Sequence, residues 1–140
     1  RLSIMVAHGT IAFDTLTTSD QKKTGTEKSL DTSYLYNGSS KVWAYFKQAS
    51  STGGAEDSLN VSSITDDGAG DFDVNYTSLM ANDDYATAQH SDAVGNNLMT
   101  NRTPVEGSSY STSLLRFMHF ENASLVDATA ASVQIVGELA

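Results

Sequence analysis

The stretch from residue 58 to residue 80 constrains the fold of this chain more than any other. It reads Ser-Leu-Asn-Val-Ser-Ser-Ile-Thr, then Asp-Asp-Gly-Ala-Gly, then Asp-Phe-Asp-Val-Asn-Tyr-Thr-Ser-Leu-Met. Apolar and polar residues alternate along both arms, which is the period of a strand. Between the arms, Gly68 and Gly70 can adopt the positive φ of a tight reversal, and Asp66 and Asp67 can hydrogen-bond the turn backbone. The stretch predicts a β-hairpin with one strand in each arm.

Similar alternation recurs along the chain. It predicts strands within residues 2–18, 85–90, 110–120 and 132–139, whereas the polar segment 18–33 predicts a loop or linker. No segment has a convincing amphipathic helical period. The chain has 140 residues, enough for one domain that buries roughly two thirds of its unfolded surface. We therefore predict an all-β fold, a small antiparallel β-sandwich built from hairpins.

Residues 41–47, Lys-Val-Trp-Ala-Tyr-Phe-Lys, differ from the other predicted strands because both faces of the segment are apolar. A strand of this kind must be covered on both sides, by a second sheet or by another subunit. We therefore assign Trp43, Tyr45 and Phe46 to the core or to subunit assembly. A platform that stacks sugars is the functional alternative for Trp43 and Tyr45.

The charge of the chain excludes one class of partner. There are 17 acidic and 8 basic residues, which gives a net charge of -9. No Lys or Arg occurs between residues 48 and 101, so this half of the molecule should repel nucleic acid. No apolar run approaches the roughly 18 residues of a membrane span, so we expect no membrane insertion.

The acidic turn of the predicted hairpin is a candidate cation site. Hard cations such as Ca²⁺ prefer several carboxylate oxygens, and the candidate ligands are Asp66, Asp67, Asp71 and Asp73. They do not follow the spacing of an EF-hand loop, and the terminal bidentate Glu is absent. The alternative is a solvated, charged surface. Because the chain has no cysteine, thiolate metal sites and disulfides are excluded.

Motifs of enzymes are missing from the sequence. It contains no nucleophile elbow of the Gly-x-Ser-x-Gly type, no His-Glu-x-x-His, no phosphate-binding loop and no dinucleotide fingerprint. His8, His90 and His119 lie far apart and lack the spacing of metal ligands. His119, between Met118 and Phe120, is interpreted as a packed or interfacial strand residue. We predict a protein without catalytic residues and without a required cofactor.

Three segments carry a resemblance to a known family. Lys-Val-Trp-Ala-Tyr-Phe at 41–46 resembles the opening of a small β module found at the C-terminal ends of bacteriophage tail fibres and related virion appendages. Residues 58–80 are similar to the most recognisable stretch of that module, with Leu59 in place of an aromatic residue and Asp67 in place of Asn. The end of the chain, 133–137, resembles its final Val-x-Val-x-Gly strand. Residues 1–29 match nothing in the module.

The resemblance implies a virion structural protein, a tail fibre or accessory fibre that assembles as a homotrimer. Its expected location is the extracellular virion, as a tail or capsid appendage. Residues 41–140 would form the β-sandwich tip module, and residues 1–40 would contain N-terminal strands and a polar segment that attaches to other virion proteins. The expected partner outside the virion is a glycan or protein of the host surface.

An up-and-down order of strands would then place successive loops at alternate ends. In that order the loops at 48–57, 81–84 and 122–129 share one end, and those at 66–70 and 91–109 share the other. We take the first set as facing the receptor, with these candidate residues: Glu56, Asp57, Asn82, Asp83, Asp84 and Asn122. A Greek-key crossing would change this grouping.

Two other functions stay open at the level of the sequence. One is a monomeric carbohydrate-binding β-sandwich of a secreted protein, with Trp43 and Tyr45 as its platform. The other is a capsid decoration protein without a receptor. The oligomeric state separates the first from a fibre, and binding to host cells separates the second.

Overall fold

A computed structural model describes residues 15–17, 29–47, 55–92, 99–102 and 110–140, with only the backbone described at 99–102. The chain divides into two compact units, Arg1–Tyr36 and Asn37–Ala140. In the first unit, the short strands β1 (Thr15–Thr17) and β2 (Ser29–Asp31) pair antiparallel. The helix α1 (Thr32–Gly38) follows β2 directly and buries none of its residues.

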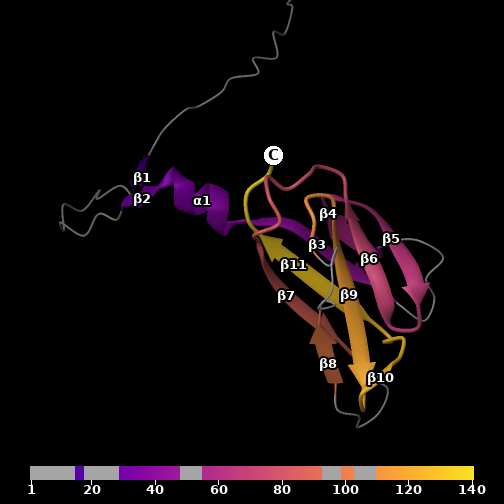
Figure 1. Cartoon of the computed structure of the whole chain (residues 1–140). Coiled ribbons are helices and arrows are strands. Elements are labelled where there is room, and N and C mark those ends of the chain that lie inside the picture. Colours follow the sequence, from indigo (N-terminus) through magenta and orange to yellow (C-terminus); the bar gives the residue numbers. More distant parts are fainter. Residues whose placement is uncertain (1–14, 18–28, 48–54, 93–98, 103–109) are drawn as a thin grey trace, which may run out of the picture. The chain divides into compact units, whose positions relative to one another are not determined.

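The second unit is the antiparallel β-sandwich that the sequence predicts (Figure 1). One sheet, here called the hairpin sheet, has the order β10-β9-β6-β5 with β8 also paired to β9. Its strands are β5 (Val61–Gly68), β6 (Asp71–Tyr76), β8 (Met99–Arg102), β9 (Leu114–Glu121) and β10 (Ser124–Leu125). The other, called the aromatic sheet, has the order β4-β3-β11-β7. Its strands are β3 (Ser40–Phe46), β4 (Asp57–Leu59), β7 (Ala86–Ser91) and β11 (Ala131–Val136).

The core lies between the two sheets. Phe46 of β3 meets both Phe72 of β6 and Phe117 of β9, with ring centroids 5.9 Å apart in each pair. All three rings are fully buried, and tilted or edge-on aromatic pairs of this kind add to the free energy of burial. Phe46 is therefore a core residue, which is one of the two roles, core or subunit assembly, that the sequence predicts for it.

The hairpin of β5 and β6 confirms the main sequence prediction. Its turn places Gly68 at φ 139° and Gly70 at φ 67°, and the Gly68 N–H donates to Asp66 Oδ1 over 3.0 Å. A Cβ atom at position 70 would lie 2.6 Å from the backbone oxygen of His119 and 2.7 Å from the backbone nitrogen of Val126. Only glycine fits there, because both neighbours are main chain.

The prediction of one continuous strand in the first arm of that stretch is wrong. Asn60 has φ 57° and separates β4, which pairs with β3, from β5, which pairs with β6. The chain crosses between the sheets at this residue. The Asn60 side chain stabilises the crossing, because it donates to the Ser78 carbonyl over 3.0 Å and accepts from the Ser78 N–H over 2.6 Å.

The prediction of a loop over residues 18–33 is also wrong at its end, where β2 and the start of α1 are formed. Asp31 Oδ1 accepts the N–H of Ser33 over 2.8 Å, which caps the helix. The sequence shows no amphipathic period over this helix, because none of its residues is buried. Strands are also predicted within residues 2–18. Thr15–Thr17 form a strand there, and residues 2–14 and 18 lie outside the described part of the chain.

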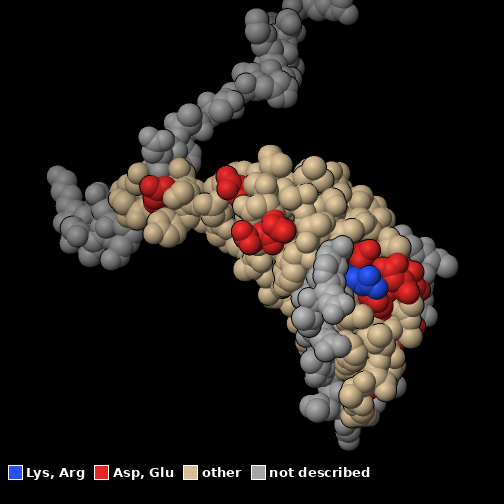
Figure 2. All heavy atoms as spheres, in the orientation of Figure 1, with Lys and Arg blue, Asp and Glu red and all other residues tan. Residues whose placement is uncertain are grey.

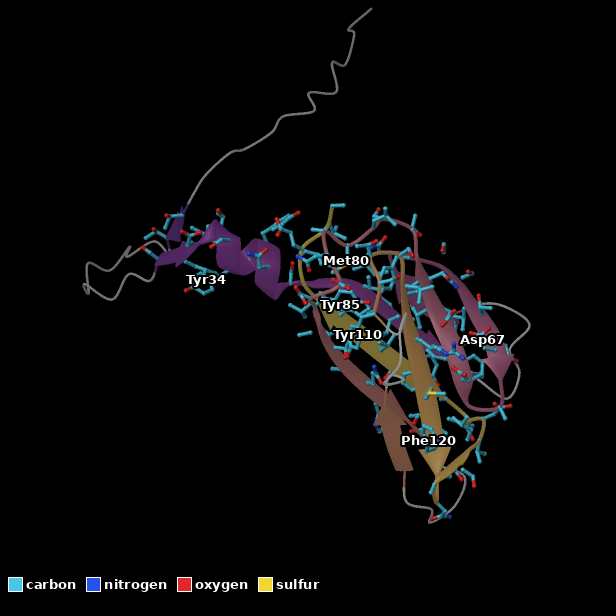
Figure 3. All side chains as sticks on the ribbon, viewed as in Figure 1. Tyr34, Asp67, Met80, Tyr85, Tyr110 and Phe120 are labelled. Carbon is cyan, nitrogen blue, oxygen red and sulfur yellow. The ribbon has the colours of Figure 1, made fainter. Side chains whose placement is uncertain are left out.

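The sandwich has two ends, named here after residues of their turns. At the Gly70 end, the Gly70 N–H donates to Asp127 over 2.7 Å, and the Ser91 hydroxyl contacts His119 over 2.6 Å. At the Met80 end, Met80 pairs with Leu139. Tyr85 and Tyr110 pack against each other nearby, with ring centroids 5.2 Å apart and ring planes inclined by 49° (Figure 3).

Candidate binding site

The outer face of the aromatic sheet contains an open depression of about 440 Å³. Its lining comes from the strands β3, β11 and β7, which lie side by side in the sheet. Tyr45 is 44 % exposed, Trp43 is partly buried and Phe46 points to the core. The following residues line the depression: Trp43, Ala44, Tyr45, Ala88, Gln89, His90, Ser132, Val133 and Gln134.

The register of the strands explains which side chains meet there. Trp43 pairs with Gln134, which pairs with Ala88. One step along the strands, Tyr45 pairs with Ser132, which pairs with His90. Cross-strand partners point to the same face of a sheet, so two rows of side chains form the depression.

The strand alternation that exposes the two aromatic side chains also anchors them. Val42, Ala44 and Phe46 alternate with them along β3 and are buried in the core. Trp43 and Tyr45 therefore project from a rigid strand rather than from a loop. The sequence predicts that this outer face is covered, but in the described chain it is open.

The electrostatics of the depression are close to neutral. Its lining residues include no Lys, Arg, Asp or Glu. Beside it, the exposed side chains of Lys47 and Glu56 form an ion pair at 3.5 Å, and the exposed His90 imidazole lies 3.4 Å from the Asp92 carboxylate. With an amide, hydroxyl and imidazole beside two aromatic rings, the face can bind a ligand through stacking and hydrogen bonds.

The outer face of the hairpin sheet has the opposite character, because Arg116 stands there among acidic side chains (Figure 2). Arg116 Nε donates to Asp71 Oδ1 over 2.8 Å, and a second nitrogen donates to the other oxygen of the same carboxylate. This bidentate pair is a strong one, and Asp71 is only 7 % exposed. Desolvation, and next repulsion from Asp67, raises the pKa of Asp73.

The candidate cation loop is not assembled as predicted. Among the described residues, no group of three or more His, Cys, Asp or Glu side chains is placed to hold a metal ion. The Asp71 carboxylate is bound by Arg116, and Asp66 Oδ1 accepts a backbone N–H of the turn. Of the four carboxylates that the sequence interpretation gave to Ca²⁺, one is therefore bound by a guanidinium and another by the turn backbone.

The predicted grouping of receptor-facing loops is wrong. Tyr45 pairs with Asp57 beside the Gly70 end, whereas Ala81 donates its N–H to Glu138 at the Met80 end. The crossing at Asn60 and the additional strand β8 change the order of ends that an up-and-down arrangement would give. The six candidates are therefore split, with Glu56, Asp57 and Asn122 toward the Gly70 end and Asn82, Asp83 and Asp84 at the Met80 end.

Two of the predicted loops are only partly described. Residues 48–54 of the loop at 48–57 lie outside the described residues, as do residues 93–98 and 103–109 of the loop at 91–109. The described acidic candidates are exposed in both end groups.

A buried polar cluster links the two sheets at the Gly70 end. Ser91 Oγ lies 2.6 Å from His119 Nδ1, and His119 Nε2 lies 3.4 Å from Glu121 Oε1. Ser91 and His119 are fully buried and Glu121 is 6 % exposed. The residue types are those of a hydrolytic triad, but a substrate cannot reach a hydroxyl that is closed to solvent. The cluster connects β7 to β9 through side chains.

The sequence points to Trp43 and Tyr45 but not to the residues on the other side of the depression. Gln134, Ser132, Ala88 and His90 lie about 45 to 90 residues away along the chain, and they join β3 through sheet pairing. The alternation of polar and apolar residues along β7 and β11 predicts the face on which these side chains lie. It does not predict which strand lies next to them in the sheet.

Comparisons with protein-family models, with curated proteins and with solved structures find no match. In the described part of the chain, no helix has the length and apolar character that crossing a membrane would require.

Proposed function

We propose that this chain is a non-catalytic attachment module of a virion appendage of the tail-fibre kind, which binds the host surface. The observation that supports binding is the open depression beside Trp43 and Tyr45. A concave site with aromatic walls and a few polar groups is the usual form of a ligand site. The virion assignment rests on the resemblance of residues 41–46, 58–80 and 133–137 to the fibre module.

The N-terminal unit supports a role in assembly. A helix of seven residues and strands of three are marginal on their own. Contact with other copies or other virion proteins would bury the large apolar side chains that this region exposes: Leu16, Leu30, Tyr34, Leu35 and Tyr36. In this proposal the homotrimer forms through the N-terminal region, and the aromatic sheet stays open.

Two measurements on the purified chain test the proposal. Sedimentation equilibrium should give a trimer, and the fluorescently labelled protein should bind cells of a bacterial panel saturably, in competition with unlabelled protein. Trimer formation should be lost in a Leu16→Ser/Tyr34→Ser variant that keeps the β circular-dichroism spectrum. A trimer that binds no strain would overturn the attachment role in favour of a capsid decoration protein.

A monomeric carbohydrate-binding domain is the second candidate, and the exposure of Tyr45 favours it. It shares the binding face but needs no assembly. A monomer that binds cells or polysaccharide would support it and contradict the fibre assignment.

A further inference from the structure

We propose that the depression on the aromatic sheet binds an uncharged saccharide, stacked on Trp43 and Tyr45. This inference deepens the proposed function, on which its role at the host surface rests. It names the chemical class of the ligand and the residues that bind it.

The aromatic pair supplies the apolar part of the site. Trp43 and Tyr45 are two residues apart on one face of β3, about 7 Å along the strand, so that adjacent rings of a saccharide can each meet one side chain. The C–H face of a pyranose ring is apolar and packs on an aromatic ring. Aromatic side chains offer large contact areas for the loss of few rotamers.

The polar part of the site matches the hydroxyl groups of a saccharide. Gln134 lies beside Trp43 in the register, and Ser132 and His90 follow Tyr45 in the next row. An amide, a hydroxyl and an imidazole can each donate or accept hydrogen bonds, as sugar hydroxyls do. Gln134 and His90 are exposed, so they can reorient toward a ligand.

The charge of the site selects an uncharged ligand. No Lys or Arg lines the depression in the part of the chain that the structure describes, and the whole chain has a net charge of -9. An anionic ligand would meet repulsion without a local partner. A second copy of this chain would meet polar Gln134 and Ser132 at the centre, where stable homodimer interfaces are apolar. A saccharide therefore fits this surface better.

The single tryptophan of the chain, Trp43, makes the test direct, because all indole fluorescence comes from the site. The full chain is titrated with dextran, a β-glucan, a mannan and a galactan as uncharged probes, and with polygalacturonate as the anionic probe. We expect at least one uncharged polysaccharide to shift or quench the emission saturably. Tyr45→Ala should weaken that binding at least about fivefold, the loss typical of an anchor residue.

Leu79→Ala is the control, since it removes an apolar side chain that is 49 % exposed and lies outside both the depression and the N-terminal assembly region, and it should bind like the parent chain. The inference is overturned if none of the uncharged probes changes the emission, if polygalacturonate alone binds, or if Tyr45→Ala binds unchanged. An emission shift that depends on protein concentration and is lost in Tyr45→Ala would assign the face to a second copy. If cell binding persists in Tyr45→Ala, the saccharide site fails while the attachment function stands.

Discussion

The two outer faces of the sandwich differ in their charge and in whether they contain an open site. On the hairpin sheet, Arg116 is held by Asp71, and the acidic neighbours stand around this pair (Figure 2). On the aromatic sheet, Trp43 and Tyr45 border an open depression whose lining carries no charged carboxylate or cation. The contrast teaches that the guanidinium of the charged face is already bound by a carboxylate of its own sheet, whereas the face without charged lining residues presents an open site to another molecule.

The largest expected effect is on the charged face. Arg116→Met should reduce the free energy of unfolding by about 2 to 3 kcal/mol, because it leaves the buried Asp71 carboxylate without its bidentate partner. Urea unfolding measures the change. Lys47→Met breaks the exposed pair with Glu56, whose side chains are 47 % and 52 % exposed, and should change stability by less than about 0.5 kcal/mol.

The double variant Arg116→Met/Asp71→Asn completes the test of this pair. It should recover part of the loss, since the unpaired charge is gone. Equal stability of Arg116→Met and the parent chain would show that the two faces do not differ in this way.

On the aromatic face, a substitution should affect binding and leave the fold intact. Ala88→Arg adds a long cation at an exposed position that pairs with Gln134, and the guanidinium can stack on Trp43 and fill the depression. We expect binding of uncharged polysaccharide to fall by more than about tenfold, with stability within about 0.5 kcal/mol of the parent chain. Indole fluorescence and urea unfolding provide the two readouts. Unchanged affinity would place the ligand elsewhere.

A smaller effect is expected from Asp73, whose pKa is raised by desolvation and by Asp67. Between the ordinary value of 3.8 and the raised value, the native state binds more protons than the unfolded state, so stability falls as pH rises through this window. At neutral pH the charged carboxylate therefore destabilises the fold. Asp73→Asn should raise stability at pH 7 by less than about 1 kcal/mol, because solvent screens much of the penalty.

Thermal unfolding at several pH values checks this sign. The gain from Asp73→Asn should disappear below the ordinary pKa of an aspartate, where both chains are neutral at this position. Asp84→Asn, in an exposed turn, is the control. A loss of stability at pH 7 in Asp73→Asn would show that this carboxylate is a favourable partner of Arg116.

The smallest effect is expected from calcium. Because Arg116 and a turn N–H already bind the carboxylates of Asp71 and Asp66, millimolar Ca²⁺ should leave the thermal midpoint unchanged relative to Mg²⁺ at equal ionic strength. A ligand bound to the native state must raise this midpoint. A rise specific to Ca²⁺ would restore the cation loop at the acidic turn.

Local patterns in the sequence predict the parts of the fold that local forces determine. The turn at Gly68 and Gly70 is predicted because its backbone conformation favours glycine. The alternation of β6 and β9 predicts the buried positions Phe72 and Phe117, because strand period and burial coincide. Asn60 is missed, because an asparagine within an alternating stretch reads as a strand residue until its positive φ is seen.

The sequence by itself determined an acidic, antiparallel all-β chain, a hairpin turn at Gly68 and Gly70, and an aromatic strand with two apolar faces. Only the tertiary structure decided which loops share an end, that Arg116 binds Asp71, and that Gln134 and His90 join Trp43 and Tyr45. The physical reason is that alternation places a side chain on a face, whereas the partner of a strand depends on where the chain crosses between sheets. In this protein one residue with positive φ makes that crossing.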